Sequence, residues 1–168
     1  SERIVIGAHY DTAGPQPGAD DNASGVAALL ELGRTFAQRP PPMRVELAAY
    51  CLEESPYCRT PCMGSAVHAD SLRRASVRVK LMIALEMVGY FTDAPKSQRY
   101  PVPGMGLIYP TRGNFIAVVG ILGQSDGLGM VVRSMRRASP LPVRSLKAHR
   151  GLPGVERSDH MNFWDHGY

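Results

Sequence analysis

The stretch RIVIGAHYDTAGPQPGADDNASGVAALLELGRTFAQ, residues 3–38, decides the fold. It opens with a run of branched apolar residues over 3–8, which is typical of a buried strand. A connection rich in glycine and proline follows over 11–20, and residues 24–38 place apolar side chains on one helical face. The three prolines at 40–42 end this helix. The stretch therefore predicts a buried strand, a polar loop and a helix.

The same alternation continues along the rest of the chain. Further strands are predicted over 43–51, 77–87, 115–119 and 143–146, and further helices over 63–75, over 125–138 and from Ser158, a good N-cap residue. Strands that alternate with helices indicate an α/β sandwich around a mostly parallel sheet. The segment 92–111 holds four prolines and is too irregular for a core element, so we expect a binding loop, a lid or a plain insertion there.

Size and charge restrict the class of protein only loosely. The chain has 168 residues, which suits one domain, and 44% of them are hydrophobic and 20% charged. Its net charge of +4 comes from scattered basic residues without interleaved aromatic ones, so we predict no nucleic-acid partner. No apolar run approaches the ~20 residues needed to span a bilayer. The sequence leaves the oligomeric state open.

The chain enters its first strand almost at once after Ser1. We therefore expect it to begin inside a domain, with any targeting segment upstream, so the compartment stays open. Cys51, Cys58 and Cys62 do not decide it either. A Cys58–Cys62 disulfide would indicate an oxidising compartment, but free or partly buried thiols are the simpler interpretation. No second cysteine pair completes a zinc knuckle.

Histidines and carboxylates gather where the predicted strands end. His9 follows the first strand, Asp20-Asp21-Asn22 precedes the first helix, Glu53-Glu54 closes the second strand, Glu86 lies near the end of the third, and Ser158-Asp159-His160 opens the last helix. Ligands of open α/β sheets collect at the carboxyl ends of the strands. Two histidines with several carboxylates suit a paired divalent-metal site, which makes hydrolysis the leading hypothesis.

The first two groups can be divided by role. A metal-bound imidazole donates its second N–H to an acceptor, and Asp11 is well placed to accept from His9. Two consecutive aspartates, Asp20 and Asp21, exceed what helix capping needs, and one of them could bridge two cations. The alternatives are a structural histidine and a simple cap.

The later groups supply further candidates. Of Glu53 and Glu54, one could bind metal while the other takes a proton from water, although a surface acidic pair is the alternative. Glu86 interrupts an apolar strand, where a carboxylate is costly unless it is paired or bound to metal. His160 is a further candidate ligand.

The strings HYDT, PGADDNASGVAALLE, the Glu-Glu pair with a following Met-Gly-Ser, LEMVGY and SDH resemble the M28 family of zinc aminopeptidases. The resemblance covers nearly the whole chain, in order. It implies a three-layer, phosphorylase/hydrolase-like sandwich with a mostly parallel mixed sheet and helices on both faces. It also implies one catalytic domain over 1–168, trimmed at both ends relative to the family.

The resemblance further implies two Zn2+ ions per chain and a role for each candidate residue. His9 and Glu86 would hold one zinc, Glu54 and His160 the other, Asp21 would bridge both, Glu53 would be the general base, and Asp11 would accept from His9. The family commonly has Asp where this chain has Glu86, and often has a cis peptide at the position of Asp21-Asn22.

The implied activity is hydrolysis of N-terminal peptide bonds, with peptides that carry a free N-terminus as substrates. One alternative is a glutaminyl-cyclase-like acyltransferase with a single zinc, which metal stoichiometry distinguishes. Another is a non-catalytic peptidase-like binding domain, which an aminopeptidase assay distinguishes.

Overall fold

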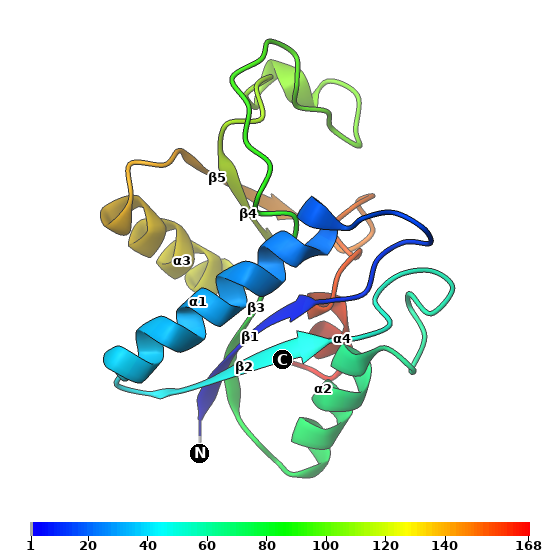
Figure 1. Ribbon diagram of the computed structural model, residues 1–168, viewed down its shortest axis with the longest axis vertical. Coiled ribbons are helices and arrows are strands. Elements are labelled where there is room, and N and C mark those ends of the chain that lie inside the picture. The colour runs from blue at the N-terminus through cyan, green and yellow to red at the C-terminus, as the bar shows by residue number, and fades with distance from the viewer. Residues whose placement is uncertain (1) are drawn as a thin grey trace. The chain divides into compact units, whose positions relative to one another are not determined.

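The computed structural model describes residues 2–168, which form two compact units (Figure 1). The first unit runs up to Gly89 and also contains Ser158–Tyr168, and the second is Tyr90–Arg157. The end of the chain thus returns to the unit in which the chain begins.

A three-stranded parallel sheet forms the centre of the first unit. Its order is β2 (Arg44–Tyr50), β1 (Arg3–His9), β3 (Val79–Ala84). Ile6 of the central strand lies beside Leu47 on one side and Ile83 on the other. Because all three strands run the same way, their carboxyl ends meet at one edge of the sheet.

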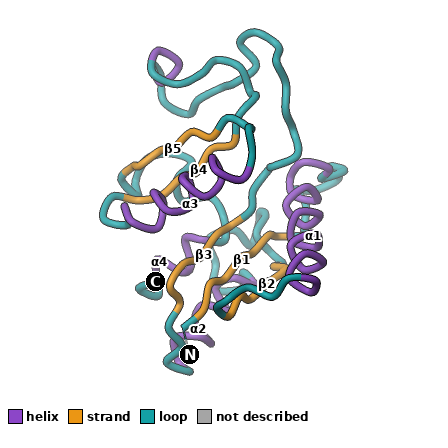
Figure 2. Tube along the Cα trace, turned by 90° about the vertical axis from the view of Figure 1, so that its left-hand side faces the viewer, coloured by secondary structure: helices purple, strands orange, loops and turns teal. Residues whose placement is uncertain are grey.

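Helices cover both faces of this sheet. Helix α1 (Gly25–Gln38) packs on β1 and β2, and Figure 2 shows it alone on its side. Helices α2 (Gly64–Arg74) and α4 (His160–Asp165) lie on the other face. The core on that side consists of Val5, Tyr50, Ala69, Leu72 and Phe163, all of them buried. Burying side chains of this size contributes about 1.5–3 kcal/mol each, which holds both helices against the sheet.

The second unit has a smaller core of its own. Strands β4 (Ile116–Ile121) and β5 (Val143–Ala148) pair in parallel, and α3 (Ser125–Ala138) packs on both. Leu128, Val132 and Val143 are buried between them. The irregular segment predicted over 92–111 contains one short 3-10 helix, η2 (Met105–Leu107), in the part that the structure describes. Leu107 at its end is 91% exposed.

The predicted α/β class with parallel strands and helices is confirmed. Every strand pairing within residues 2–168 is parallel, and the strands form two sheets where the sequence predicts one mostly parallel mixed sheet. The third strand is shorter than predicted: β3 ends at Ala84 because Leu85 and Met87 bond to a side chain of another loop. Within the described residues, no helix combines the length and apolarity that crossing a bilayer demands.

The last helix begins near Ser158 as predicted, but Ser158 does not cap it. Asp159 occupies the N-cap position of α4, with no side-chain hydrogen bond to the helix. The hydroxyl of Ser158 instead donates to a carboxylate oxygen of Glu86, 2.7 Å away. A capping serine accepts from a backbone N–H, whereas here the hydroxyl donates, and Ser158 lies one residue before the N-cap position of α4.

Candidate metal centre

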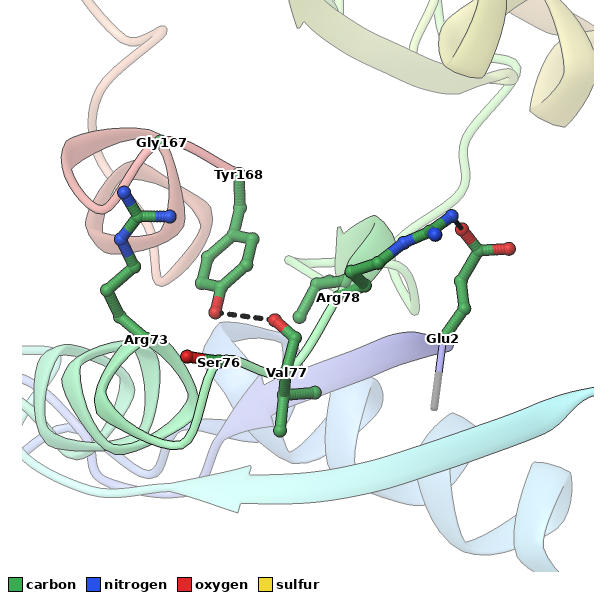
Figure 3. A pocket seen from close by; sticks show the side chains of 8 residues that line it. Glu2, Arg73, Ser76, Val77, Arg78, Gly167 and Tyr168 are labelled. Carbon is green, nitrogen blue, oxygen red and sulfur yellow. Dashed lines mark hydrogen bonds and ion pairs between the residues drawn. The ribbon is translucent and has the colours of Figure 1, made fainter.

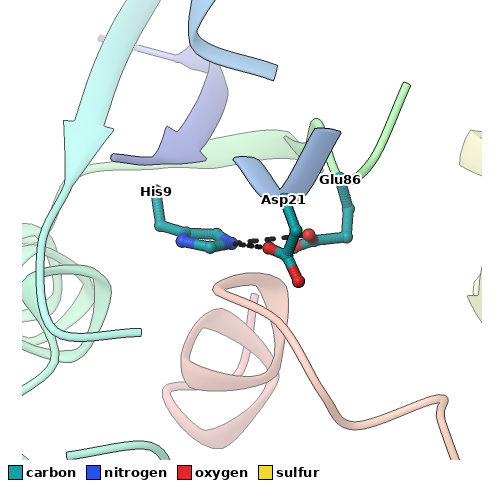
Figure 4. A group of neighbouring side chains, drawn as sticks. All are labelled: His9, Asp21 and Glu86. Carbon is teal, nitrogen blue, oxygen red and sulfur yellow. Dashed lines mark hydrogen bonds and ion pairs between the residues drawn. The ribbon is translucent and has the colours of Figure 1, made fainter. Parts of the chain in front are cut away.

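Three predicted ligands come together at the carboxyl edge of the first unit's sheet (Figure 4). His9 is the last residue of β1, Asp21 lies in the kinked turn η1 (Ala19–Ser24) before α1, and Glu86 follows β3 by two residues. The Nε2 atom of His9 is 3.3 Å from Asp21 Oδ1 and 3.4 Å from Glu86 Oε1. One ligand atom from each of the three residues lies within 4.8 Å of the other two. Their donor atoms therefore surround one small volume.

The orientation of the His9 ring is fixed by Asp11, on the side opposite to the carboxylates. The side chain is 1% exposed, and its Nδ1 atom lies 3.1 Å from the backbone oxygen of Asp11 and 3.5 Å from that residue's carboxylate. Because a carbonyl oxygen only accepts, Nδ1 carries a proton, and Nε2 is the nitrogen that faces the carboxylates. Asp11 thus provides the expected acceptor for His9, with its main-chain oxygen closer than its side chain.

The carboxylate of Asp11 braces the Glu-Glu pair. Its two oxygens accept hydrogen bonds from the backbone N–H groups of Glu53, at 3.2 Å, and Glu54, at 3.0 Å. Glu53 is buried, and its carboxylate lies 3.8 Å from Nε2 of His9. Asp11, two residues after the end of β1, thereby fixes the position of the two acids that follow β2.

Asn22, which the sequence offered only as a loop residue, joins the Asp-rich loop to the segment around Glu86. The peptide bond between Asp21 and Asn22 is cis, as the family resemblance implied. The amide of the fully buried Asn22 donates to the backbone oxygen of Leu85 at 2.8 Å and accepts from the backbone N–H of Met87 at 3.2 Å. The main chain on either side of Glu86 is therefore held by one side chain.

The first residue of α1, Gly25, is a glycine for a steric reason. The N–H of Gly25 donates to the side-chain oxygen of Asn22 at 3.2 Å. A Cβ on Gly25 would lie 2.4 Å from that oxygen and 2.7 Å from the backbone oxygen of Leu85. Only glycine lets α1 begin this close to the loop.

Negative charge accumulates at the site. Burial raises the pKa of Glu53 to about 8; the charge of His9 opposes this, and the charges of Glu86, Asp159 and Glu54 add to it. Burial likewise raises the pKa of Asp159 to about 6, and it raises the pKa values of Asp21 and Glu54. Burial alone would lower the pKa of His9, but its hydrogen bond to Glu86 and the charges of the surrounding carboxylates raise it to about 9.

These features fit a divalent cation. The Oδ1 atom of Asp21 is buried and accepts no hydrogen bond from the residues that the structure describes. The donor set of one imidazole nitrogen and several carboxylate oxygens is one that zinc accepts. A bound cation would also offset the repulsion among carboxylates that raises their pKa values.

The other two predicted ligands lie outside this compact group. The Glu54 carboxyl is close enough to Asp21 for that charge to raise its pKa, after the larger effect of burial. His160, the first residue of α4, packs its ring edge-on against Trp164, with ring centroids 4.5 Å apart. The structure therefore brings His9, Asp21 and Glu86 together, with Glu53 adjoining them.

Two further residues at the site carried no clear signal in the sequence. The hydroxyl of Ser158, whose local pattern indicated a helix cap, donates to the carboxylate of Glu86. Asp159 is fully buried, and among residues 2–168 the neighbouring hydroxyl of Ser65 lowers its pKa without offsetting the larger effect of burial. Its place in the SDH string was the available signal.

A hollow of about 580 Å³ at the opposite edge of the first unit is chemically different (Figure 3). It is lined by residues near the amino ends of β1 and β3 and by the end of the chain, among them Glu2, Arg73, Arg78 and Tyr168. Glu2 is the one carboxylate side chain among its lining residues, and it pairs with Arg78 at 2.6 Å. This hollow does not offer a set of metal ligands.

Fold and site together define an α/β protein with a candidate carboxylate–histidine metal centre at its strand ends. The model of "Peptidase family M28" matches residues 1–112. The chain belongs to peptidase family M28, which confirms the resemblance seen in its sequence motifs.

Curated relatives carry related names. The chain is 50% identical over 171 residues to the uncharacterized protein YfbL of Escherichia coli (strain K12), a match that covers 97% of this chain and 52% of that protein. A probable zinc metalloprotease of Pyrenophora tritici-repentis is 38% identical over 51% of this chain and 20% of its own length. Aminopeptidase YwaD of Bacillus subtilis is 31% identical over 51% of this chain and 18% of its own length.

The chain thus spans about half the length of the Escherichia coli relative and about a fifth of the other two. No solved structure matches it.

Proposed function

We propose that this chain carries the active site of a co-catalytic dinuclear zinc aminopeptidase, which hydrolyses N-terminal peptide bonds. The observation that carries the proposal is the convergence of His9, Asp21 and Glu86, with Glu53 3.8 Å from the same imidazole nitrogen. The names of two relatives, a probable zinc metalloprotease and an aminopeptidase, agree with it.

The residues divide between two zinc ions. His9 and Glu86 would hold one ion, Glu54 and His160 the other, and Asp21 would bridge both. When bound, zinc supplies a Lewis acid for the scissile carbonyl and lowers the pKa of water toward ~7.

Glu53 is the general base of the proposed reaction. It takes a proton from the attacking water and later passes that proton to the leaving amine. Two features suit it to this role: its carboxyl is buried beside the ligand group, and Asp11 fixes its main chain. Burial also raises its pKa to about 8, toward neutral pH, where proton exchange with water is efficient.

The excess of carboxylates also favours a substrate with a free α-amine. An ammonium group is attracted to a cluster in which the charges of neighbouring acids raise the pKa of Glu53 and Glu54. Peptides whose N-terminus is blocked lack this charge. The proposed substrates are therefore peptides with a free N-terminus.

The test is Glu53→Gln, which keeps the shape of the side chain and removes the base. We expect kcat on an aminoacyl p-nitroanilide to fall by about 10²–10⁴-fold, the usual contribution of a general base. Zinc content, measured by atomic emission, should stay at the unsubstituted value. The matched control is Glu31→Gln on the exposed face of α1, which should change neither. Full activity in Glu53→Gln, or loss of zinc together with activity, would contradict the assigned role.

The glutaminyl-cyclase-like alternative with a single zinc is the second candidate, because the compact group supplies ligands for one ion. Two zincs per chain in equilibrium dialysis favour the peptidase, and one zinc favours the acyltransferase. A chain that binds zinc but cleaves no aminoacyl substrate would favour the non-catalytic binding domain.

A further inference from the structure

We infer that Ser158 is a positioning residue for the metal ligand Glu86: its hydroxyl binds one carboxylate oxygen and leaves the other for the metal. The inference rests on the proposed function, because it assigns Ser158 a role toward the zinc that Glu86 would hold.

The geometry divides the two oxygens of Glu86. Oε2 accepts the hydrogen bond from the Ser158 hydroxyl at 2.7 Å, and Oε1 lies 3.4 Å from Nε2 of His9. The Ser158 side chain is buried and that of Glu86 is 31% exposed, so the bond is partly shielded from water. A hydroxyl that donates to a carboxylate forms one of the stronger side-chain hydrogen bonds, and here it fixes which oxygen faces the ligand group.

Main-chain contacts alone do not orient this side chain. Asn22 holds the backbone at Leu85 and Met87, but three rotatable bonds separate the Glu86 backbone from its carboxylate. Glutamate has one more such bond than the aspartate that the family commonly has at this position. The Ser158 hydroxyl removes that extra freedom at the far end of the side chain, before a metal binds. Preorganising a ligand in this way lowers the entropic cost of binding.

The contact also joins two segments far apart in the sequence. Ser158 lies 72 residues after Glu86 and two residues before His160, so the same short segment orients one ligand and carries another. The serine of the SDH string therefore orients Glu86, which would hold the first zinc, while the histidine would hold the second.

The experiment is a zinc titration of the chelator-treated chain by isothermal calorimetry. Ser158→Ala should weaken zinc binding by about 10–100-fold, as removal of a residue that orients a ligand usually does. Ser158→Thr retains the hydroxyl and should restore affinity close to that of the unsubstituted chain. In Glu86→Asp, where the shorter side chain loses the contact, adding Ser158→Ala should weaken binding much less than it does with Glu86 present.

The control is Ser71→Ala in α2. It also removes a serine hydroxyl that donates one hydrogen bond, here to the backbone oxygen of His68 at 2.7 Å within the same helix. Circular dichroism of each metal-free variant confirms that it is folded, and Ser158→Thr keeps the test decisive if Ser158→Ala does not fold.

Unchanged zinc affinity in Ser158→Ala, or an equal loss in Ser71→Ala, would overturn the inference while leaving the proposed function intact. Failure of Ser158→Thr to bind zinc better than Ser158→Ala would overturn it too. If the unsubstituted chain binds no zinc at this group, the proposed function fails and the inference falls with it; if it binds zinc but cleaves no aminoacyl substrate, only the proposed function fails.

Discussion

Asp11 connects two strand ends at the scale of single residues. Its main-chain oxygen faces His9, and its carboxylate accepts hydrogen bonds from the backbone N–H groups of Glu53 and Glu54. One residue therefore fixes both a predicted ligand and the predicted base.

Replacing Asp11 tests this connection. In Asp11→Ala the two N–H groups lose their acceptor, while the main-chain oxygen remains available to His9. We expect kcat to fall by about 10–100-fold, with a smaller change in KM, because Glu53 loses its fixed position. Steady-state kinetics and zinc content measure the two effects. A variant with unchanged kcat would show that the Glu-Glu pair keeps its position without the hydrogen bonds to Asp11.

The sequence predicted some of the site residues and not others, for a physical reason. His9, Asp21 and Glu86 follow from chemistry at strand ends, because parallel strands bring such residues to one edge. Asn22 and Ser158 act through hydrogen bonds to residues 63 to 72 positions away, and no local pattern contains those partners. The capping rule placed the cap one residue too early, because α4 begins at His160 and its N-cap position is Asp159.

The turn η1 and the segment that follows β3 act together at the scale of elements. The amide of Asn22 hydrogen-bonds the backbone oxygen of Leu85 and the backbone N–H of Met87, both beyond the end of β3. The hydroxyl of Ser24 accepts from the N–H of Val88 at 3.0 Å. These contacts position Asp21 and Glu86 toward each other, and they explain why the third strand stops at Ala84.

Asn22→Ala removes this connection. It leaves the part-buried backbone groups at Leu85 and Met87 without their side-chain partner, at a combined cost of about 1–3 kcal/mol because water can reach them in part. We therefore expect a lower free energy of unfolding in urea, together with weaker zinc binding. The matched control is Asn114→Ala, whose amide makes a solvent-exposed hydrogen bond to Asp93 in the second unit and should cost little. Equal losses in the two variants would contradict a special role for Asn22.

Most helices and strands follow from periodicity, and their ends do not. The helix predicted over 125–138 is found as α3 with the same bounds, because one face carries the apolar residues that pack on β4 and β5. By contrast, the predicted 115–119 and 143–146 strands extend to Ile121 and Ala148. Pairing between β4 and β5 lengthens both, and pairing is not visible in either segment alone.

The whole chain contains two units, each with its own parallel sheet and core. The alternation of strands and helices predicted the class and the parallel pairing. The order β2-β1-β3 depends on contacts between distant segments, so it becomes visible only in three dimensions.

The crowding of acids predicts how the stability of the metal-free protein depends on pH. The pKa of Glu53 rises from 4.5 to about 8, that of Asp159 from 3.8 to about 6, and that of His9 from 6.5 to about 9. Between the ordinary and the raised pKa of each group, the folded state binds more protons than the unfolded state. All three contributions are therefore fully present at low pH and are lost as pH rises through these values.

Thermal unfolding of the chelator-treated chain from about pH 5 to pH 9 measures this dependence. We expect the melting temperature to fall across that range, and saturating zinc to raise it more at the alkaline end, because metal ligands must be deprotonated. Glu53→Gln should show a shallower fall. A melting temperature that rises with pH in the metal-free protein would contradict the charge distribution of the site.

The central claim is that His9, Asp21 and Glu86 hold zinc beside Glu53. Anomalous scattering at the zinc edge, from a crystal of the chain grown with zinc, tests it most directly. The account predicts two peaks that share Asp21, one at His9 and Glu86 and the other at Glu54 and His160. A zinc-saturated crystal with no peak at His9, Asp21 and Glu86 would contradict it.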